Sequence, residues 1–494
     1  MPARYLTLFL IGVALSIAQF VMVRDFVSIL YGEEIVIVLV TSTFFLGMSV
    51  GYVLSLRLSM RAFRRLFLGS VFIHLSFPFS YRVLAAYFAE WDLGGLSFLA
   101  LLIVYALVFN LVFASFLPRL ISDSDDDAGD GLGESQRLRS YYSLELAGFM
   151  TGFAIVALSW NRPSVFLLGT YWLILGTLLH LVLGRVRVTA VFAVLATTAV
   201  AFFGQIDRGS TALLYEHKHS VREPNVLYSI NSPYQKVQVI EDRRGELFLY
   251  LDGLLNLNSG DLEDLNYYLA ELPAVLVQPR KTLVIGNGTL SSVPKVYPHS
   301  GTVTSVELDG AVLEAGRRFF TDPAMLAGLD NWELKVDDGR HFLRKTEDRF
   351  DLIIVDVPSP LTIQEATMHT IEFYELADSR LTDTGVIAVQ LSGPLSRNDR
   401  TPARVAGALA QVFPEVMVIN SDKADRGFAY ASRNLPFNGR QAREAAADYE
   451  RGLDLIRPSQ LKSYVDRAEP LSTDRMDLVL RRGWARFFDR YLRG

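Results

Sequence analysis

The feature that most constrains this chain is the density of long apolar runs in its first 204 residues. Most of these runs approach the roughly 20 residues that an α-helix needs to cross a bilayer. They are Tyr5–Val23, Ile35–Leu56, Leu66–Phe88, Leu96–Leu117, Tyr141–Leu158, Val165–Leu183 and Val188–Phe203. With 50% apolar residues and a mean hydropathy of +0.25, the 494-residue chain is too hydrophobic for an ordinary soluble enzyme. Residues 1–204 are therefore predicted to form a multi-span α-helical membrane domain in contact with the lipid bilayer.

Small residues inside the second run predict close helix packing. The segment FFLGMSVGYVLS contains Gly47 and Gly51 at a spacing of four. Small residues let helix backbones approach in lipid, where no hydrophobic force drives helices together. The alternative is that both glycines are merely tolerated.

Composition also excludes several classes of protein and site. The net charge is -5 and no block of Lys and Arg occurs, so a nucleic-acid partner is not expected. The chain has no cysteine, which excludes disulfides and thiolate metal sites. His217 and His219 are the only close histidine pair and have no matching carboxylate cluster, so no metal is expected.

Beyond residue 204 the pattern changes to that of an α/β protein. Residues 205–280 read as a linker and a small β subdomain, because YQKVQVIEDRRGELFLYLDGLLNL alternates apolar and polar residues on both sides of a turn. In residues 281–494 the apolar strands LVIG, VTSVEL, ELKV, DLIIVD, GVIAVQ and EVMVI alternate with helical segments. This alternation predicts a Rossmann-like, doubly wound and mainly parallel sheet, with ligands at the carboxyl ends of its strands.

Four features fall at those strand ends. Gly286 and Gly288 follow the first strand, where a missing Cβ lets backbone amides approach a ligand. Glu307 ends the second strand about twenty residues later, the place from which a carboxylate accepts ribose hydroxyls. Asp338 with Gly339 follows the third strand, and Asp356 ends the fourth. Four features in register favour a nucleoside site, although each alone has a structural alternative, such as an aspartate that caps the next helix.

These residues resemble the spermidine synthase (polyamine aminopropyltransferase) family in its membrane-fused form, over about Ser232 to Asp474. The matching motifs are SPYQKVQV, LDGLLNL, LVIGNG, SVELD, VDDGRHFL, DLIIVDVPSP followed by IEFY, and the late LSTD.

The resemblance implies a membrane-bound transferase that moves an aminopropyl group from decarboxylated S-adenosylmethionine to an amine or polyamine. Asp356 matches the family's proton acceptor, which would be the general base. The donor-binding positions that the resemblance implies are Gln235, Gly286, Gly288, Thr289, Glu307, Asp338 and Gly339. Ser359 and Asn266 fall at substrate-binding positions, and no metal is implied.

Four departures from the family pattern weaken diamine binding. Thr289 stands where the family has an aspartate for the aminopropyl ammonium, and Ser359 where a second aspartate holds the diamine. The family's Tyr-His/Gln-Glu motif appears as LNY at residues 265–267, and NSDKADRGFAY lacks the tyrosine that reaches the polyamine. Charge-assisted hydrogen bonds of this kind are worth on the order of 1.5 to 3 kcal/mol each. Ordinary putrescine is therefore expected to bind weakly.

Three functions remain open on these residues. The first is an aminopropyltransferase with an altered acceptor. The second is a methyltransferase that uses ordinary S-adenosylmethionine, which Thr289 would tolerate. The third is a non-catalytic nucleoside or polyamine sensor coupled to a membrane transporter or scaffold, in which Glu145 inside the fifth run would be the sensitive residue. The sequence leaves open whether the chain forms a homo-oligomer.

Two signals conflict about the side of the cell (inner) membrane on which the α/β part lies. Arginines gather in the loops after the second, fourth and sixth runs, which predicts that these loops and the N-terminus are cytoplasmic. They are Arg57, Arg61, Arg64, Arg65, Arg119, Arg137, Arg139, Arg185 and Arg187. Seven spans would then put the α/β part on the opposite side. A nucleoside co-substrate made in the cytoplasm favours the cytoplasm, and this is the side we expect.

Overall fold

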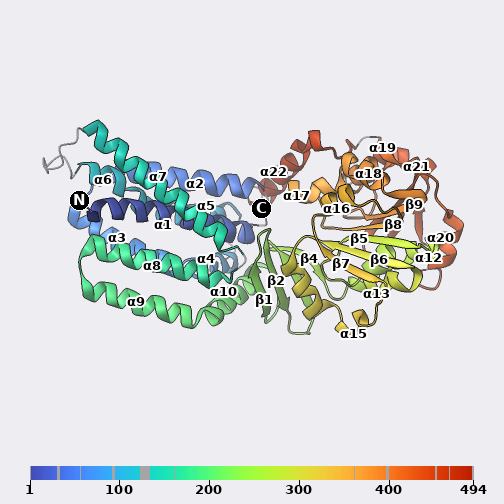
Figure 1. Ribbon diagram of the computed structural model, residues 1–494, viewed down its shortest axis with the longest axis horizontal. Coiled ribbons are helices and arrows are strands. Elements are labelled where there is room, and N and C mark those ends of the chain that lie inside the picture. Colours follow the sequence, from blue (N-terminus) through green and yellow to red (C-terminus); the bar gives the residue numbers. More distant parts are fainter. Residues whose placement is uncertain are drawn as a thin grey trace. The chain divides into compact units, whose positions relative to one another are not determined.

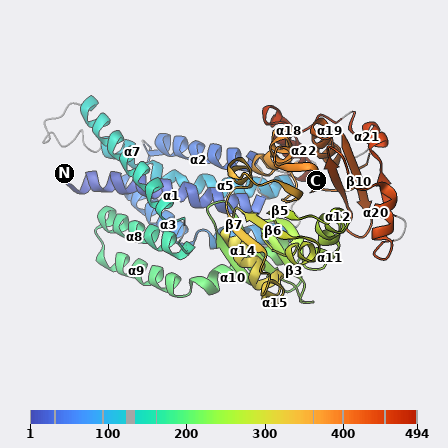
Figure 2. The same ribbon diagram turned by 45° about the vertical axis from the view of Figure 1, so that its right-hand side comes forward.

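The computed structural model describes every residue except 1, 31–33, 56, 92–94, 123–133, 161, 361, 397–399, 451–452, 467 and 492–494. The chain forms two compact units (Figures 1 and 2). The helical unit comprises Met1–Arg244, Leu251–Leu254 and Arg486–Gly494, and the α/β unit comprises Gly245–Tyr250 and Leu255–Ala485. Each unit buries an apolar core of its own.

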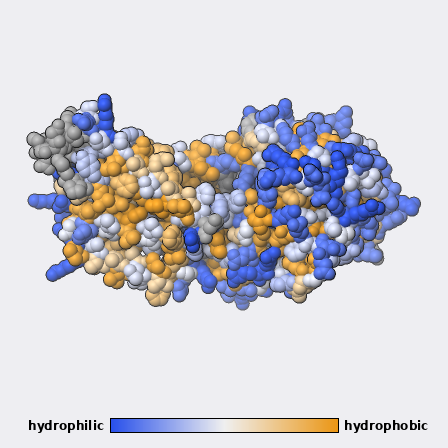
Figure 3. All heavy atoms as spheres, viewed as in Figure 1, coloured by the Kyte–Doolittle hydropathy of each residue, from blue (hydrophilic) through white to orange (hydrophobic). Residues whose placement is uncertain are grey.

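Long apolar helices make up most of the helical unit. Its helices are α1 (Pro2–Leu30), α2 (Glu34–Ser55), α3 (Met60–Ser76), α4 (Phe79–Glu90), α5 (Gly95–Ala114), α6 (Phe116–Ser122), α7 (Glu134–Leu158), α8 (Ser164–Leu183), α9 (Val186–Ala201) and α10 (Phe203–Lys218). Large apolar side chains remain exposed on this unit, for example Val38 at 60% and Leu173 at 72%. Figure 3 shows hydrophobic residues over much of the visible face of this unit. An exposed apolar surface of this extent is typical of a helix bundle surrounded by lipid.

In the part of the chain that the structure describes, five helices are long and apolar enough to cross a membrane: Ala3–Leu30, Glu34–Ser55, Gly95–Arg119, Leu138–Leu158 and Ser164–Leu183. Two further helix pairs pass the same test only together and are bent, α3 with α4 by 79° and α9 with α10 by 73°. The predicted run Leu66–Phe88 crosses the first bend, whereas Val188–Phe203 coincides with α9 and ends at the second bend. Counting each bent pair as one crossing gives up to seven. The prediction of a continuous helix over Leu66–Phe88 is wrong, since Pro78 lies between α3 and α4 and cannot continue the hydrogen-bond ladder.

Glycines bring the helices into close contact at two crossings. A Cβ on Gly51 would lie 2.3 Å from the carbonyl oxygen of Leu111, so the predicted packing role of FFLGMSVGYVLS agrees with the structure. At the crossing of α1 and α7, a Cβ on Gly148 would lie 2.0 Å from the carbonyl oxygen of Phe9. Glu145 is buried at the same crossing, and its Oε1 has no hydrogen-bond partner among the described residues.

Four charged side chains meet in the helical unit, of which Asp25, Arg82 and Lys236 are buried and Asp207 is half-buried. Arg82 of α4 donates from Nη2 to Asp25 of α1 at 2.8 Å and from Nη1 to Asp207 of α10 at 2.6 Å. Lys236 of β2 lies 3.6 Å from the same Asp25 oxygen. Two positive and two negative charges compensate one another, which burial of charged groups requires. The cluster thereby connects α1, α4, α10 and β2.

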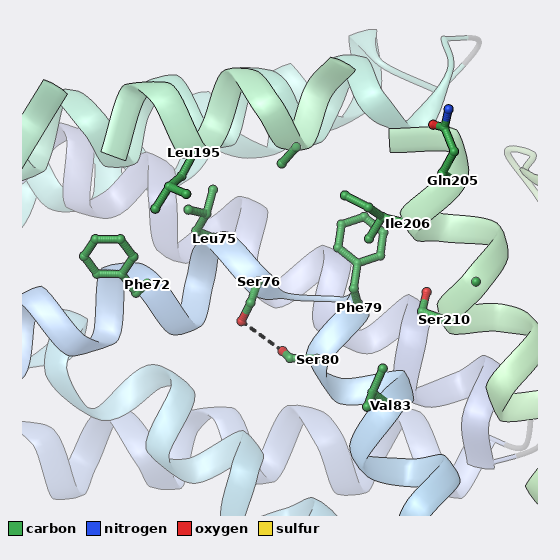
Figure 4. Close-up of a pocket in the computed structure, with 12 residues that line it drawn as sticks. Phe72, Leu75, Ser76, Phe79, Ser80, Val83, Leu195, Gln205, Ile206 and Ser210 are labelled. Carbon is green, nitrogen blue, oxygen red and sulfur yellow. Dashed lines mark hydrogen bonds between the residues drawn. The ribbon is translucent and has the colours of Figure 1, made fainter. Parts of the chain in front are cut away.

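An open cavity of about 650 Å³ lies where the two bent pairs meet (Figure 4). Apolar side chains such as Leu75, Phe79 and Ile206 form most of its wall. Ser76 and Ser80 also line it, and the Ser76 hydroxyl donates to Ser80 at 3.1 Å. The predicted site residues do not line this cavity.

A small antiparallel sheet follows the helices, in the order β1-β2-β3-β4. Its strands are β1 (Asn225–Asn231), β2 (Lys236–Glu241), β3 (Leu247–Leu251) and β4 (Leu254–Asn258). Strands β2 and β3 are neighbours, as the alternating pattern around the RRGE turn predicts.

The α/β unit is built on an eight-stranded sheet in the order β12-β10-β11-β9-β8-β5-β6-β7. Its strands are β5 (Lys281–Gly286), β6 (Thr302–Glu307), β7 (Trp332–Val336), β8 (Phe350–Asp356), β9 (Leu381–Gln390), β10 (Glu415–Ser421), β11 (Arg426–Ser432) and β12 (Asp454–Ile456). Strands β5 to β9 pair in parallel, as predicted. Strands β10, β11 and β12 pair antiparallel, so the sheet is mixed.

Helices cover both faces of this sheet, which explains its continuous apolar strands. Successive residues point to opposite faces: Leu283 and Ile285 enter one core, and Val284 enters the other. The helical segments are α11 (Leu262–Asn266), η1 (Tyr267–Glu271), α12 (Leu272–Val277), α13 (Val293–Val296), η2 (Tyr297–His299), α14 (Gly310–Ala315), η3 (Gly316–Phe320), α15 (Pro323–Leu326), α16 (Gly339–Lys345), α17 (Ile363–Ala366), η4 (Thr367–His369), α18 (Ile371–Asp378), α19 (Arg400–Val412), α20 (Gly439–Ala446), α21 (Pro458–Val465), η5 (Thr473–Arg475) and α22 (Asp477–Tyr491).

We predict that replacing Gly148 with leucine destabilises the helical unit. The new side chain would overlap the backbone of Phe9, and overpacking of this kind costs roughly 1 to 3 kcal/mol. Thermal unfolding of the full-length protein in detergent should show a lower melting temperature. Gly69→Ala is the matched control, because a Cβ there meets nothing within 4 Å. Equal loss of stability in both variants would contradict the assigned crossing.

Candidate active site

The carboxyl ends of the parallel strands bring the predicted residues to one edge of the sheet. Gly286 at the end of β5 is in register with Asp356 at the end of β8. On the other side of β5, Glu307 ends β6, which pairs with β5 through Val306 and Ile285. The register therefore places the glycine loop between two carboxylates.

The glycines allow this loop to lie against both neighbouring strands. Gly286 has φ +83, and a Cβ there would lie 2.1 Å from the carbonyl oxygen of Asp356. The amide of Asn287 donates to that same oxygen at 2.9 Å. A Cβ on Gly288 would meet Val312 at 2.3 Å and the Glu307 carboxylate at 3.4 Å. A larger residue at either position would push the loop away from the carboxylates.

The loop around Gly288 has a strained backbone, and its polar side chains hydrogen-bond to one another. Asn287 has φ +59 and the buried Leu290 has φ +60, a conformation that costs on the order of 1 to 3 kcal/mol for such residues. The Thr289 hydroxyl lies 2.8 Å from Asn287 Oδ1 and 2.7 Å from Ser291 Oγ. Thr289 thus brings no charge to the site, and its hydroxyl already has partners. Strain held at one loop is typical of a functional site.

Glu307 is a half-buried carboxylate that accepts a hydrogen bond from the backbone. The amide of Asp309 donates to its Oε1 at 2.9 Å. Burial raises the pKa of Glu307 to about 7, and the nearby charge of Asp356 acts in the same direction. Because Asp356 affects this pKa, the two carboxylates share one electrostatic environment.

Asp356 has the pKa of a candidate general base. Burial raises its pKa from 3.8 to about 6, while a hydrogen bond from Ser292 and the positive charge of Arg426 oppose that rise. A base with a pKa near 6 is ionised at neutral pH and still binds a proton more readily than an ordinary aspartate.

Ser292 and Asn266 extend the hydrogen bonding of Asp356. The buried Ser292 hydroxyl lies 3.2 Å from Asp356 Oδ2 and 3.2 Å from Asn266 Oδ1. A hydroxyl has one hydrogen, so it donates to one of these acceptors at a time. When Asp356 is protonated it can donate to Ser292, which then donates to Asn266. Asn266 is a predicted substrate position, whereas sequence reasoning missed Ser292, which no motif distinguishes from its neighbours in the loop.

Asp338 and Gly339 begin helix α16 at the end of β7. The exposed Asp338 accepts the amide of His341 at 2.8 Å and so caps the helix, the structural alternative considered for it. Gly339 is buried, and a Cβ there would meet Ile285 at 2.5 Å. The absence of a Cβ at Gly339 thus lets α16 begin in close contact with β5. The assignment of Asp338 as a donor-binding residue stays a prediction.

Two other predicted positions, Ser359 and Gln235, do not lie at a strand end of the eight-stranded sheet. Ser359 is half-buried in the segment after β8. Gln235 belongs to the helical unit, where its amide donates to the Ser232 hydroxyl at 3.0 Å. Its assignment as a donor contact stays a prediction. The described residues contain no group of three or more His, Cys, Asp or Glu side chains that could hold a metal ion.

Two further polar residues at this edge escaped sequence reasoning. Gln390 ends β9, and Arg426 begins β11. Arg426 Nη1 donates to Gln390 Oε1 at 2.6 Å, and Gln390 Nε2 donates to the carbonyl oxygen of Val357 at 2.7 Å. The sequence does not assign Arg426 to this edge, because the direction of β11 decides at which end of the sheet its first residue lies.

We predict that Asp356→Asn stabilises the α/β unit above the pKa of Asp356. A raised folded-state pKa means that stability is lost as the pH rises from the unfolded value of 3.8 through about 6. Each pKa unit corresponds to about 1.4 kcal/mol, so the ionised carboxylate costs on the order of 2 to 3 kcal/mol. Hydrogen exchange of peptides from β5 and β8 should be slower in the variant at about pH 8, and nearly unchanged at about pH 4. Equal exchange rates at about pH 8 would contradict the raised pKa.

Known proteins share this part of the chain. Residues 266–421 match the family described as the spermine/spermidine synthase domain. Polyamine aminopropyltransferase 2 of Pseudomonas aeruginosa is 31% identical over 245 residues, which are 46% of this chain and 68% of that protein. The polyamine aminopropyltransferase of Streptococcus pneumoniae is 31% identical over 203 residues, 40% of this chain and 70% of that protein. The crystal structure of spermidine synthase from Thermotoga maritima aligns with 49% of this chain and 84% of that chain, at 22% identity and a TM-score of 0.39. The match to the family model and the 31% identity to the Pseudomonas aeruginosa protein confirm the spermidine synthase resemblance, whereas the membrane-fused form stays a prediction. The chain belongs to the spermine/spermidine synthase family.

Proposed function

We propose that this protein is a membrane-bound aminopropyltransferase that uses decarboxylated S-adenosylmethionine as donor and an amine as acceptor. The observation that carries the proposal is the pairing of Gly286 with Asp356, flanked by Glu307, at one edge of the sheet. Membership in a family whose similar members are polyamine aminopropyltransferases supports the reaction class.

The proposed reaction needs a base and a fixed geometry. Asp356 takes a proton from the acceptor ammonium, and the freed amine attacks the carbon next to the donor sulfonium. The N–C bond forms as the C–S bond breaks, and the electron pair of the broken bond returns to sulfur, so methylthioadenosine leaves. Ser292 and Asn266 hold the base in place. Alignment of amine and carbon supplies much of the remaining rate enhancement.

The donor would lie over β5 and β6. Glu307 is placed to accept the ribose hydroxyls, and Gly288 leaves room for the nucleoside beside that carboxylate. Gly339 offers backbone against which an adenine ring can lie. Helix α16 and β7 would close the adenine end.

We predict that Asp356→Asn reduces turnover by about 10²- to 10⁴-fold while sparing donor binding, because it removes the base and little volume. Wild-type kcat/KM should rise with pH with a midpoint near 6, where Asp356 ionises. Mass spectrometry of detergent-purified protein should detect methylthioadenosine as the product.

The matched control for this prediction is Asp383→Asn, which changes an exposed carboxylate near the opposite end of β9. Its turnover should equal that of the wild type. Unchanged turnover in Asp356→Asn would refute the base assignment. Release of S-adenosylhomocysteine from ordinary S-adenosylmethionine would instead indicate a methyltransferase.

We further propose that the helical unit lies in the cell membrane and that the α/β unit lies on the side opposite the arginines. The first residues of α1 pack against Leu117 and Tyr141, next to the arginine-rich loops. Arg119 donates to the carbonyl oxygen of Ser55 at 3.1 Å, which adds the end of α2 to the same group. The opposite end of α1 carries Asp25, whose partner Lys236 begins β2.

Up to seven crossings, with arginines and β2 at opposite ends of α1, support an extracytoplasmic α/β unit. The cytoplasmic location expected from donor supply is the competing proposal. On the extracytoplasmic side, the donor would have to be delivered across the membrane.

We predict that a cysteine at Asp330 in the α/β unit reacts with a membrane-impermeant maleimide in intact cells, whereas a cysteine at Ser135 reacts only after permeabilisation. The chain has no cysteine, so each variant carries a single reactive thiol, and both positions are exposed. The reverse labelling pattern would show a cytoplasmic α/β unit.

A further inference from the structure

Polar residues follow one another along the sheet edge in the order of the strands. From one side, the order is Arg426 of β11, Gln390 of β9, Asp356 of β8, Gly286 of β5 and Glu307 of β6. The proposed donor residues therefore lie on one side of Asp356. Arg426 and Gln390 lie on the other side, which is the acceptor side if Asp356 is the base.

Hydrogen bonds fix the position of the Arg426 guanidinium. Gln390 is 5% exposed and donates to the backbone of Val357 just after Asp356. Its side-chain oxygen accepts from Arg426 Nη1 at 2.6 Å. Gln390 is thus buried, makes two hydrogen bonds and fixes the position of the guanidinium. This arrangement is expected of a binding residue rather than of a mobile surface arginine.

Arg426 is not part of a structural ion pair. Among the residues that the structure describes, no carboxylate forms an ion pair with its guanidinium, whose one side-chain hydrogen bond is the one to Gln390. Its charge nevertheless acts on Asp356. Arg426 is half-buried, so the remaining N–H groups of the planar fork are free to bind a ligand.

The charges on the acceptor side disfavour a dication. Ser359 is neutral at the position where the family resemblance implies the acid that holds the diamine. A diamine bound with one nitrogen at Asp356 would bring its second ammonium toward the guanidinium, and like charges in a low-dielectric site repel strongly. A carboxylate at that end would instead form charge-assisted, bidentate hydrogen bonds with the guanidinium.

We propose that the acceptor is an amine that carries a carboxylate at its far end, an ω-amino acid, with the carboxylate held by Arg426 and the amine presented to Asp356. This inference rests on the proposed aminopropyl transfer. The new bond joins the acceptor nitrogen to the aminopropyl carbon, the C–S bond breaks, and the proton passes to Asp356. The products are methylthioadenosine and a secondary amine that retains the carboxylate.

The test compares matched acceptors on detergent-purified, full-length protein. A series of ω-amino acids is assayed beside diamines of the same chain length, each with decarboxylated S-adenosylmethionine. The wild-type protein should favour the ω-amino acid in kcat/KM by on the order of 10- to 100-fold, the worth of one charge-assisted contact pair. Arg426→Gln should lose that preference through a higher KM, with kcat for saturating acceptor little changed.

Two variants serve as controls. Arg426→Lys keeps the charge without the fork and should restore part of the preference. Arg433→Gln removes the arginine at the opposite end of β11, where it pairs with Asp378 at 2.7 Å, and should behave as the wild type. Donor binding measured by calorimetry should be equal in all variants, which shows that each is folded.

The outcomes separate this inference from the reaction itself. Wild-type preference for diamines, or equal preference in wild type and Arg426→Gln, overturns the anionic acceptor while the transferase function stands. If the protein instead forms a carboxylated product from ordinary S-adenosylmethionine and a diamine, the carboxylate belongs to the donor. This result also overturns the anionic acceptor. If no amine is converted, the proposed transferase function fails. Calorimetry of ω-amino acid binding to the methylthioadenosine-loaded protein then tests the anion subsite by itself. Loss of this binding in Arg426→Gln supports the subsite, and equal binding in wild type and variant overturns it.

Discussion

The active-site architecture depends on one close contact, in which the backbone of Gly286 lies against the carbonyl oxygen of Asp356. Parallel pairing of β5 with β8 sets this register, and the Asn287 amide locks it with a hydrogen bond. The contact fixes how far the glycine loop stands from the candidate base. It also fixes the distance from the loop to Glu307, because β6 pairs with the other edge of β5. The proposed donor and acceptor positions are therefore set by the sheet and not by flexible side chains.

Burial gives the two carboxylates different properties from those of surface acids. Burial raises the pKa of Glu307 to about 7 and that of Asp356 to about 6, and the charge of Asp356 adds to the rise at Glu307. The Ser292 hydrogen bond and the charge of Arg426 oppose the rise at Asp356. Both carboxyls therefore bind a proton more readily than surface acids do.

The sequence predicted the elements whose apolar pattern is local. Strands β5 to β10 were identified from their apolar runs, and Gly286, Glu307 and Asp356 from their positions at strand ends. Ser292 and Arg426 were missed because they reach the site only through the packing of α13 and the antiparallel direction of β11. The bend at Pro78 was missed because apolar residues continue on both sides of it. Patterns along the chain identify the strands, whereas contacts between distant segments complete the site.

The buried charge cluster has a consequence for how the protein is made. Asp25 belongs to α1, Arg82 to α4 and Asp207 to α10, and Lys236 begins β2, the strand that follows soon after α10. During synthesis from the N-terminus, Asp25 of α1 has no partner in this cluster until α4 has been made, and the charges of the cluster balance only once β2 has been made. Biogenesis of the helices is for this reason coupled to synthesis of the first hairpin, and a chain ended after α10 would keep an excess negative charge in its interior.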